Sequence, residues 1–268
     1  MTELLLFRLF GPFASWGEVA VGEVRPSALR PTRSALLGLL AAALGLERQD
    51  EEAQLALAAG VRFAVRIDSP GVPAVDYHTV NYRKPERKEV VLTRADELRV
   101  ARDLLSTVQS WRHYRCDALF TVAVAPTEAA RYSLALLQAA LERPVFPLSL
   151  GRKACVPALP LGPQRVAATT LLEAFAAYET RQPAELPTWY PEKLASMRQQ
   201  QSLEVCADAE FPLEFGGPAS EHFVERRDEI LSRRRWRFSS RRERVYSIAR
   251  RSPAAEEVRD VSQSVDPG

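Results

Sequence analysis

The chain has 268 residues, of which 46% are hydrophobic and 26% charged, a composition typical of a globular protein with a buried core. The net charge is only +2, no apolar run is long enough to predict a membrane-spanning helix, and the N-terminus lacks the pattern of a signal peptide. Cys116, Cys155 and Cys206 are odd in number and widely spaced, so we expect reduced thiols in a cytoplasmic protein, not disulfides or a zinc site.

The first part of the chain predicts strands joined by a helix. An apolar run at 4–10, ended by a Gly-Pro pair, predicts a buried strand, and alternating apolar and arginine residues predict a second strand at 60–68. Between them we expect a helix over 32–46, which Thr32 or Ser34 can cap. This helix has almost no polar face, so we expect it to be covered on more than one side.

Residues 82–115 interrupt this pattern, because they carry nine basic and five acidic residues and few apolar ones in their first half. We expect them to project from the fold. The sequence then predicts a strand at 116–126, a helix at 127–142 and a short strand at 143–155. The resulting order is that of the βαββαβ unit of ferredoxin-like folds. Such a four-stranded sheet is a common platform for single-stranded RNA, although the fold alone does not establish the function.

The C-terminal part predicts a helix at 166–178 and then antiparallel strands joined by basic turns. We therefore expect an α+β fold with two domains. Residues 1–157 would form the ferredoxin-like domain, with a β-hairpin thumb inserted at about 80–114. Residues 158–268 would form a smaller, mainly antiparallel β region with a mobile tail.

Arginine dominates the basic residues, with 32 of 36, which a GC-rich genome or phosphate binding can each explain. Residues 226–251 hold eleven arginines and three acids, and Arg241 and Arg242 lie among them. The planar guanidinium fork suits phosphate because it donates two hydrogen bonds to one anion. The same cluster can also be a solvated face, so it suggests nucleic acid without proving it.

Three further segments combine cations with features that favour RNA. Residues 76–88 alternate aromatic and basic side chains, as in proteins that stack bases and track phosphates, although a solvated hairpin has the same composition. Residues 150–157 place two cations beside a glycine, which suits an anion or a plain turn. Residues 24–33 hold three arginines and two prolines at the start of a helix, whose N-terminus favours phosphate.

No segment matches a catalytic or metal-binding motif. The sequence contains no GxSxG, HExxH, Walker or Rossmann glycine pattern, and its three histidines have no partner at zinc-ligand spacing. We therefore predict no catalytic residue, no metal and no cofactor.

The segments GPFASWG, RPTRSALLGLLAAALGL, DYHTV, YRCDALFTVAV, SLGRKACVPALPL and RRWRFSSRRERVY follow one another in this order. Together they resemble the CasD family, the fifth-family Cas subunits (RAMP superfamily) of the type I-E CRISPR complex Cascade, from about residue 4 to 250. The resemblance implies a non-catalytic subunit that caps the backbone-subunit filament and holds the 5′ handle of crRNA beside its thumb. Further implied partners are the large subunit that reads the protospacer-adjacent motif, other Cascade subunits and, through the complex, target DNA; no membrane is expected.

The residue patterns and the resemblance together give one set of expected RNA-binding residues. They are Trp16, Arg25, Arg30, Arg33, Ser34, His78, Thr79, Arg83, Lys84, Arg87, Lys88, Gly151, Arg152, Lys153, Arg241 and Arg242.

Two other functions stay open at this point. One is a metal-independent endoribonuclease that processes repeat RNA, as in the type I-C relative of this subunit. Its acid, base and cation would come from Tyr77, His78, His113, Tyr114 and Lys153. The other is an interaction protein whose arginines contact acidic partner surfaces.

Overall fold

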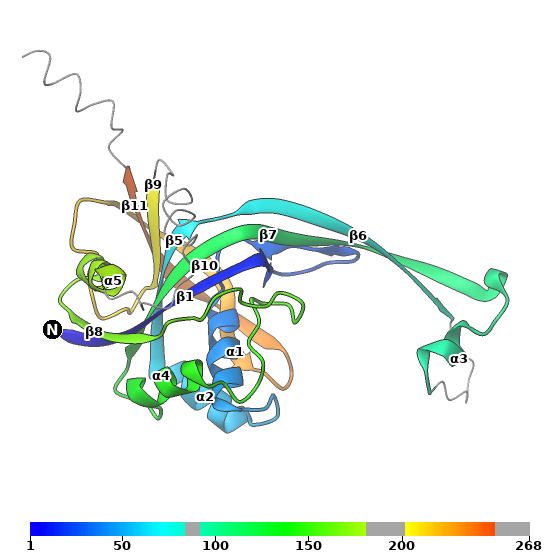
Figure 1. Ribbon diagram of the computed structural model, residues 1–268, viewed down its shortest axis with the longest axis horizontal. Helices are drawn as coiled ribbons and strands as arrows, with labels where there is room; N and C mark the ends of the chain where they lie inside the picture. Colours follow the sequence, from blue (N-terminus) through cyan, green and yellow to red (C-terminus); the bar gives the residue numbers. More distant parts are fainter. Residues whose placement is uncertain (84–91, 181–201, 250–268) are drawn as a thin grey trace, which may run out of the picture.

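The computed structural model describes residues 1–83, 92–180 and 202–249. Within these residues the chain forms a mixed α+β fold around one mainly antiparallel sheet, ordered β10-β11-β9-β5-β7-β1-β8, with β3 and β6 also paired to β7 (Figure 1). The strands of this sheet are β1 (Thr2–Ala14), β3 (Val24–Arg25), β5 (Val61–Ser69), β6 (Val72–Arg83), β7 (Leu105–Pro126), β8 (Gln164–Ala168), β9 (Ser202–Asp208), β10 (Ser220–Ser232) and β11 (Arg237–Ala249). A separate short pair joins β2 (Trp16–Gly17) to β4 (Ser27–Ala28).

Helices cover both faces of the sheet (Figure 1). They are α1 (Arg33–Leu44), α2 (Glu51–Gly60), α4 (Leu134–Glu142) and α5 (Leu171–Thr180), with the short α3 (Arg94–Leu98) and the 3₁₀ turn η1 (Arg102–Leu104) outside the core. Strand β1 is buried on both sides: Leu5 and Phe7 join the core under α1, α2 and α4, whereas Leu4 and Leu6 join the core under α5. This alternation follows from the two-residue period of a strand.

Helix α1 forms as the sequence predicts. The Thr32 side chain accepts a hydrogen bond from the Ala35 backbone N–H, and Gly45 ends the helix at φ 77°. Leucine residues such as Leu36 and Leu40 are buried, and the helix contacts α2, α4 and β10 as well as core residues of the sheet. The expectation that this helix is covered on more than one side is therefore confirmed.

Two expected elements are corrected by the structure. Residues 143–155 form no strand; Leu150 and Cys155 instead close a tight loop through a backbone hydrogen bond of 2.7 Å. Its glycine and prolines disfavour a regular ladder. The strand beside β1 is β8, which overlaps the start of the range 166–178 where a helix was expected, and the helix there, α5, begins only at Leu171.

The expected helix at 127–142 starts later, at Leu134, because Ser133 caps it. Thr127 instead stabilises a turn, where its hydroxyl donates to the Ala59 carbonyl oxygen at 2.8 Å. Helix α2 was not expected from the sequence.

The basic projection is a long β-hairpin. Strand β6 pairs with β7 without interruption from Val72, opposite Cys116, to Arg83, opposite Leu105, and the pair extends away from the sheet (Figure 1). The hairpin therefore begins at Val72, before the expected 80, because the Val, Tyr and Thr residues that precede position 80 favour strand.

The C-terminal strands continue the same sheet, since β9 pairs with β5. The division into two domains stays a prediction. Among the described residues, no helix has the length and hydrophobicity needed to cross a membrane.

Candidate nucleic-acid interface

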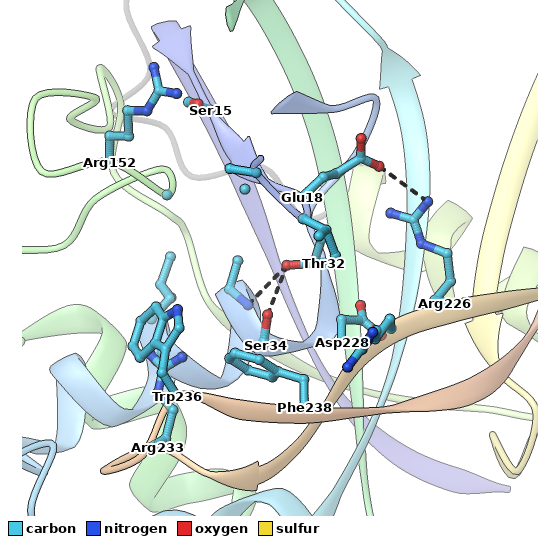
Figure 2. Close-up of a pocket in the computed structure, with 18 of the residues that line it drawn as sticks. Ser15, Glu18, Thr32, Ser34, Arg152, Arg226, Asp228, Arg233, Trp236 and Phe238 are labelled. Atoms are coloured by element: carbon cyan, nitrogen blue, oxygen red, sulfur yellow. Dashed lines mark hydrogen bonds and ion pairs between the residues drawn. The ribbon is translucent and has the colours of Figure 1, made fainter. Parts of the chain in front are cut away.

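A groove of about 1210 Å³ lies between the loop after β1, the first turns of α1, the loop 149–153 and the hairpin of β10 and β11 (Figure 2). It exceeds the size of a typical small-molecule pocket, so an extended ligand suits it better. Its cationic lining residues are Arg152, Lys153, Arg226, Arg227, Arg233 and Arg237, and its acidic ones are Glu18, Glu225 and Asp228.

Most of these cations are not neutralised. Among the described residues, only Arg226 of the six forms an ion pair, with Glu18 at 3.7 Å. The carboxylate of Asp228 is already engaged, because it accepts from the Arg241 Nε at 2.7 Å and from the Arg33 backbone N–H at 2.7 Å. The groove therefore carries an excess of positive charge, which attracts a polyanion.

Gly151 lets one wall of the groove lie close against Ser15, between β1 and β2. Its φ is +90°, and a Cβ at this position would lie 1.9 Å from the Ser15 carbonyl oxygen. Only glycine fits there. The next residue, Arg152, donates to the Arg25 carbonyl oxygen at 3.0 Å, and its guanidinium lies 4.7 Å from the Tyr114 ring centroid. The structure thus brings Arg25, Gly151, Arg152 and Lys153 together at the base of the hairpin.

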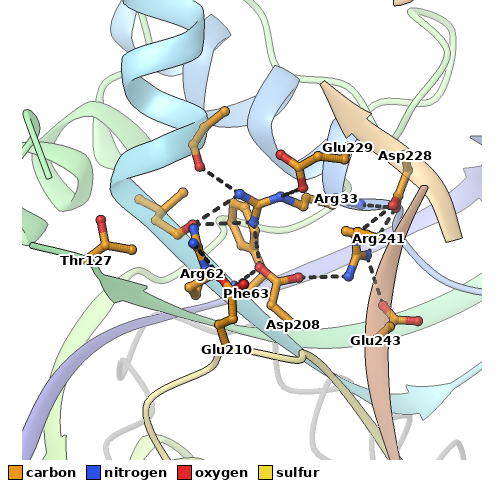
Figure 3. A network of polar contacts seen from close by, with 12 residues as sticks. Arg33, Arg62, Phe63, Thr127, Asp208, Glu210, Asp228, Glu229, Arg241 and Glu243 are labelled. Atoms are coloured by element: carbon orange, nitrogen blue, oxygen red, sulfur yellow. Dashed lines mark hydrogen bonds and ion pairs between the residues drawn. The ribbon is translucent and has the colours of Figure 1, made fainter. Parts of the chain in front are cut away.

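Arg30, Arg33 and Arg241 belong instead to a buried ion-pair network, in which Figure 3 shows Arg33 and Arg241. Arg33 is 3% exposed and pairs with Asp208 and with Glu229 at 2.8 Å. Arg30 pairs with Glu243. This corrects the expectation that these arginines present their charge to a ligand, because each guanidinium is occupied by carboxylates inside the protein.

Asp208 is the centre of this network. It accepts from Arg241 at 2.9 Å and from the Phe63 backbone N–H at 2.9 Å, in addition to its pair with Arg33. Burial raises the pKa of Asp208 above its usual value, and the two arginines act in the opposite direction. Burial also works to lower the pKa of Arg241, but the surrounding carboxylates outweigh it, so this pKa lies above its ordinary value. The network joins the start of α1 to β9, β10 and β11.

Other expected residues are dispersed. Trp16 is 1% exposed and packs edge-on against Phe120 with ring centroids 5.9 Å apart, so it is a core residue and not a base platform. Ser34 lines the groove, with its Oγ 3.1 Å from the Thr32 Oγ1. Arg242 is exposed on β11, with its guanidinium 4.3 Å from the Phe223 ring centroid.

The expected hairpin residues do not share one surface. His78 and Thr79 are adjacent in β6 and therefore point to opposite faces. Arg83 is the last residue of β6. The remaining three expected residues, Lys84, Arg87 and Lys88, lie outside the described residues.

The same register separates the two histidines proposed for RNA cleavage. His78 lies opposite Ser110, whereas His113 lies opposite Val75, so the two histidines project from opposite faces of the hairpin. They do not form an acid–base pair within it. No group of His, Cys, Asp and Glu suited to a metal ion occurs among the described residues.

Several groove residues were not singled out from the sequence. They are Arg226, Arg227, Arg233, Trp236, Arg237 and Phe238. The signal was the RRRWR run at 233–237, where a tryptophan interrupts an arginine cluster. Only the folded hairpin shows that this run faces α1.

Comparison with solved structures relates this fold to CRISPR proteins. A chain of a "CRISPR RNA-guided surveillance complex" superposes with a TM-score of 0.59 and 28% identity, covering 94% of this chain and 92% of the other. A second structure, "Crystal structure of Cas protein", gives a TM-score of 0.53 and 26% identity, covering 92% and 95% of the two chains.

Sequence comparison identifies the family. Over 155 residues the chain is 37% identical to the CRISPR system Cascade subunit CasD of Escherichia coli strain K12, an alignment that covers 58% of this chain and 67% of that relative. The family model described as CRISPR-associated protein (Cas_Cas5) matches residues 4–244. The chain therefore belongs to this family of CRISPR-associated proteins, which confirms the resemblance seen in the sequence.

Proposed function

We propose that this protein is a subunit of a Cascade-type surveillance complex and that it binds the 5′ handle of crRNA in the basic groove. The observation that carries the proposal is the excess of cations in the groove that no described carboxylate neutralises. The Cascade subunit among its relatives and the RNA-guided complex among the similar structures support the same role.

The RNA would follow a path from the base of the hairpin into the groove. Arg25, Arg152 and Lys153 form the start of this path, and Arg233 lies at the far end, well separated from Arg152 in Figure 2. Arginine and lysine side chains contact phosphates without regard to sequence, so these residues would position the strand.

We infer a ferredoxin-like βαββαβ arrangement for the N-terminal unit, with the β6–β7 hairpin as its thumb. The antiparallel order β5-β7-β1-β8, with α1 and α4 on one face, supports this inference. Residues beyond 157 would add the C-terminal strands that complete the groove.

We further propose that the subunit binds RNA without cutting it, contacts the backbone filament and the large subunit that reads the protospacer-adjacent motif, and reaches target DNA only through the complex. The separation of His78 and His113 supports the absence of cleavage by that pair. The three free thiols support a cytoplasmic location.

The test removes two cations at the start of the path. In the full chain, Arg152→Ala with Lys153→Ala weakens binding of a labelled handle RNA and makes the binding less dependent on salt. Because each phosphate contact on a single strand contributes about 0.7 to the slope of log K against log salt, the loss of two contacts lowers the slope by about 1.4.

A matched control removes two exposed arginines outside the groove, Arg131 and Arg143. Its affinity and salt slope should equal those of the unmodified protein. An unchanged slope in the groove variant would refute the proposed path. Specific cleavage of repeat RNA in EDTA by the purified protein would refute the non-catalytic role.

A further inference from the structure

An arginine–tryptophan cluster lies at the far end of the groove, in the turn between β10 and β11. Trp236 adopts φ 55° and leaves 58% of its surface exposed. The guanidinium carbons of Arg48 and Arg233 each lie 4.8 Å from the indole centroid. Phe238 packs edge-on beside the indole, with ring centroids 5.7 Å apart. The two arginines therefore contact the indole of Trp236 but leave more than half of its surface exposed.

The cluster is fixed by contacts from outside the turn. Arg48 Nε donates to the Arg233 carbonyl oxygen at 2.9 Å, and Arg48 Nη2 donates to the Arg234 carbonyl oxygen at 3.1 Å. The Arg233 guanidinium packs against Gly38 on α1, where a Cβ would lie 2.8 Å from its Nη2. The geometry of the cluster is therefore preorganised before any ligand arrives.

Arg48 and Arg233 place two positive charges beside the same indole. Among the described residues, no carboxylate forms an ion pair with Arg48 or Arg233. Burial lowers the pKa of Arg233, and the nearby charge of Arg48 lowers it further. Two like charges at one indole are repulsive, and an anionic group between or beside them relieves that repulsion.

We propose that Arg48, Trp236 and Arg233 form a stacking site for one unpaired nucleobase of single-stranded RNA, with the adjoining phosphate on the arginine pair. Aromatic rings and guanidinium planes are the surfaces on which proteins stack splayed bases. This site rests on the proposed function, because it continues the path that starts at Arg152. A partner protein that used the same arginines and indole would lose binding in Trp236→Ala while RNA binding stayed unchanged.

The test measures the contribution of the nucleobase to the binding affinity separately from that of the phosphate. The probes are a fluorescently labelled oligo(A) of about 12 nucleotides, a length within the range covered by single-strand binding folds, and an oligomer of the same length with abasic ribose units. Trp236→Ala in the full chain weakens oligo(A) binding about 5- to 150-fold, the range measured for loss of one stacked base. Trp236→Phe keeps most of the affinity, because a phenyl ring still stacks.

The abasic oligomer supplies the decisive comparison. It binds the unmodified protein more weakly than oligo(A) does, and Trp236→Ala weakens it no further. If the variant weakens both probes equally, Trp236 acts only by shaping the turn and the stacking site is refuted. Thermal unfolding of each variant identifies any loss that comes from misfolding, and Trp236→Phe then carries the test alone.

Failure of this inference is distinct from failure of the proposed function. If Arg152→Ala with Lys153→Ala weakens oligo(A) binding while Trp236→Ala leaves it unchanged, the groove binds RNA but the stacking site is wrong. If the unmodified protein binds neither probe, the proposed function fails with it. Loss of subunit assembly in Trp236→Ala with unchanged RNA binding would indicate a protein contact and overturn the proposal.

Discussion

Replacing Arg33 by methionine separates a structural role from a role in RNA binding. The sequence pattern suggested a phosphate contact, whereas the structure buries this guanidinium among carboxylates. Methionine keeps the long unbranched shape and removes the charge and the donors. We expect the variant to lose stability and to affect RNA binding only through unfolding.

The magnitude follows from the partners left behind. The substitution removes the ion pairs with Asp208 and Glu229 and leaves the Ala58 carbonyl oxygen, an acceptor at 2.7 Å, without this donor. Removing one partner of a buried ion pair costs about 3–5 kcal/mol. Asp208 keeps its contacts with Arg241 and Phe63, so we expect a value near the lower end, about 3 kcal/mol.

Urea unfolding, followed by circular dichroism, measures the loss. At a slope of about 3 kcal/mol/M, the midpoint shifts down by about 1 M. Arg25→Ala is the matched control, because Arg25 is exposed at the end of β3, in the segment before α1, and its midpoint should move little. An unchanged midpoint in Arg33→Met together with lost RNA binding would contradict the reasoning. A second check adds Asp208→Asn, which removes the carboxylate charge that has lost its partner Arg33, so the double variant should lose less than the sum of the two single losses.

Two further predictions concern the groove wall and a buried thiol. Gly151→Ala should lower the melting temperature and weaken RNA binding, because the new Cβ would lie 1.9 Å from the Ser15 carbonyl oxygen. Gly17→Ala is the control: its Cβ would have no atom within 4 Å, so neither quantity should change. Equal melting temperatures for the two variants would contradict the steric argument. Burial raises the pKa of Cys206 to about 12. Iodoacetamide at pH 8 should therefore leave this thiol unmodified in the native protein and label the partly exposed Cys116 first. Mass spectrometry of the treated protein measures both. The Cys206 thiol ionises at a lower pH in the unfolded chain than in the folded protein. The free energy of unfolding should therefore fall as pH rises above about 9, by up to about 1.4 kcal/mol per pH unit. Cys206→Ala should remove this contribution to the fall.

The elements with strong local signals were predictable. Helix α1 carries its own cap at Thr32 and its own stop at Gly45, and β5 carries a clear two-residue alternation, so local physics defines both. The expected strand at 143–155 failed because its apolar residues pack as an irregular loop. Hydrophobicity alone does not distinguish these two ways of burying a leucine.

The sequence by itself determined the family, the basic hairpin and the concentration of arginine near the C-terminus. Tertiary structure decided which arginines are available. Arg33 and Arg152 look alike in sequence, each beside a loop and near the end of an element. Arg33 nevertheless meets carboxylates from β9 and β10, whereas Arg152, in the part of the chain that the structure describes, meets a carbonyl oxygen and a ring. Whether a cation is free to bind a phosphate depends on acids brought close by long-range strand pairing. No local pattern in the sequence contains that information.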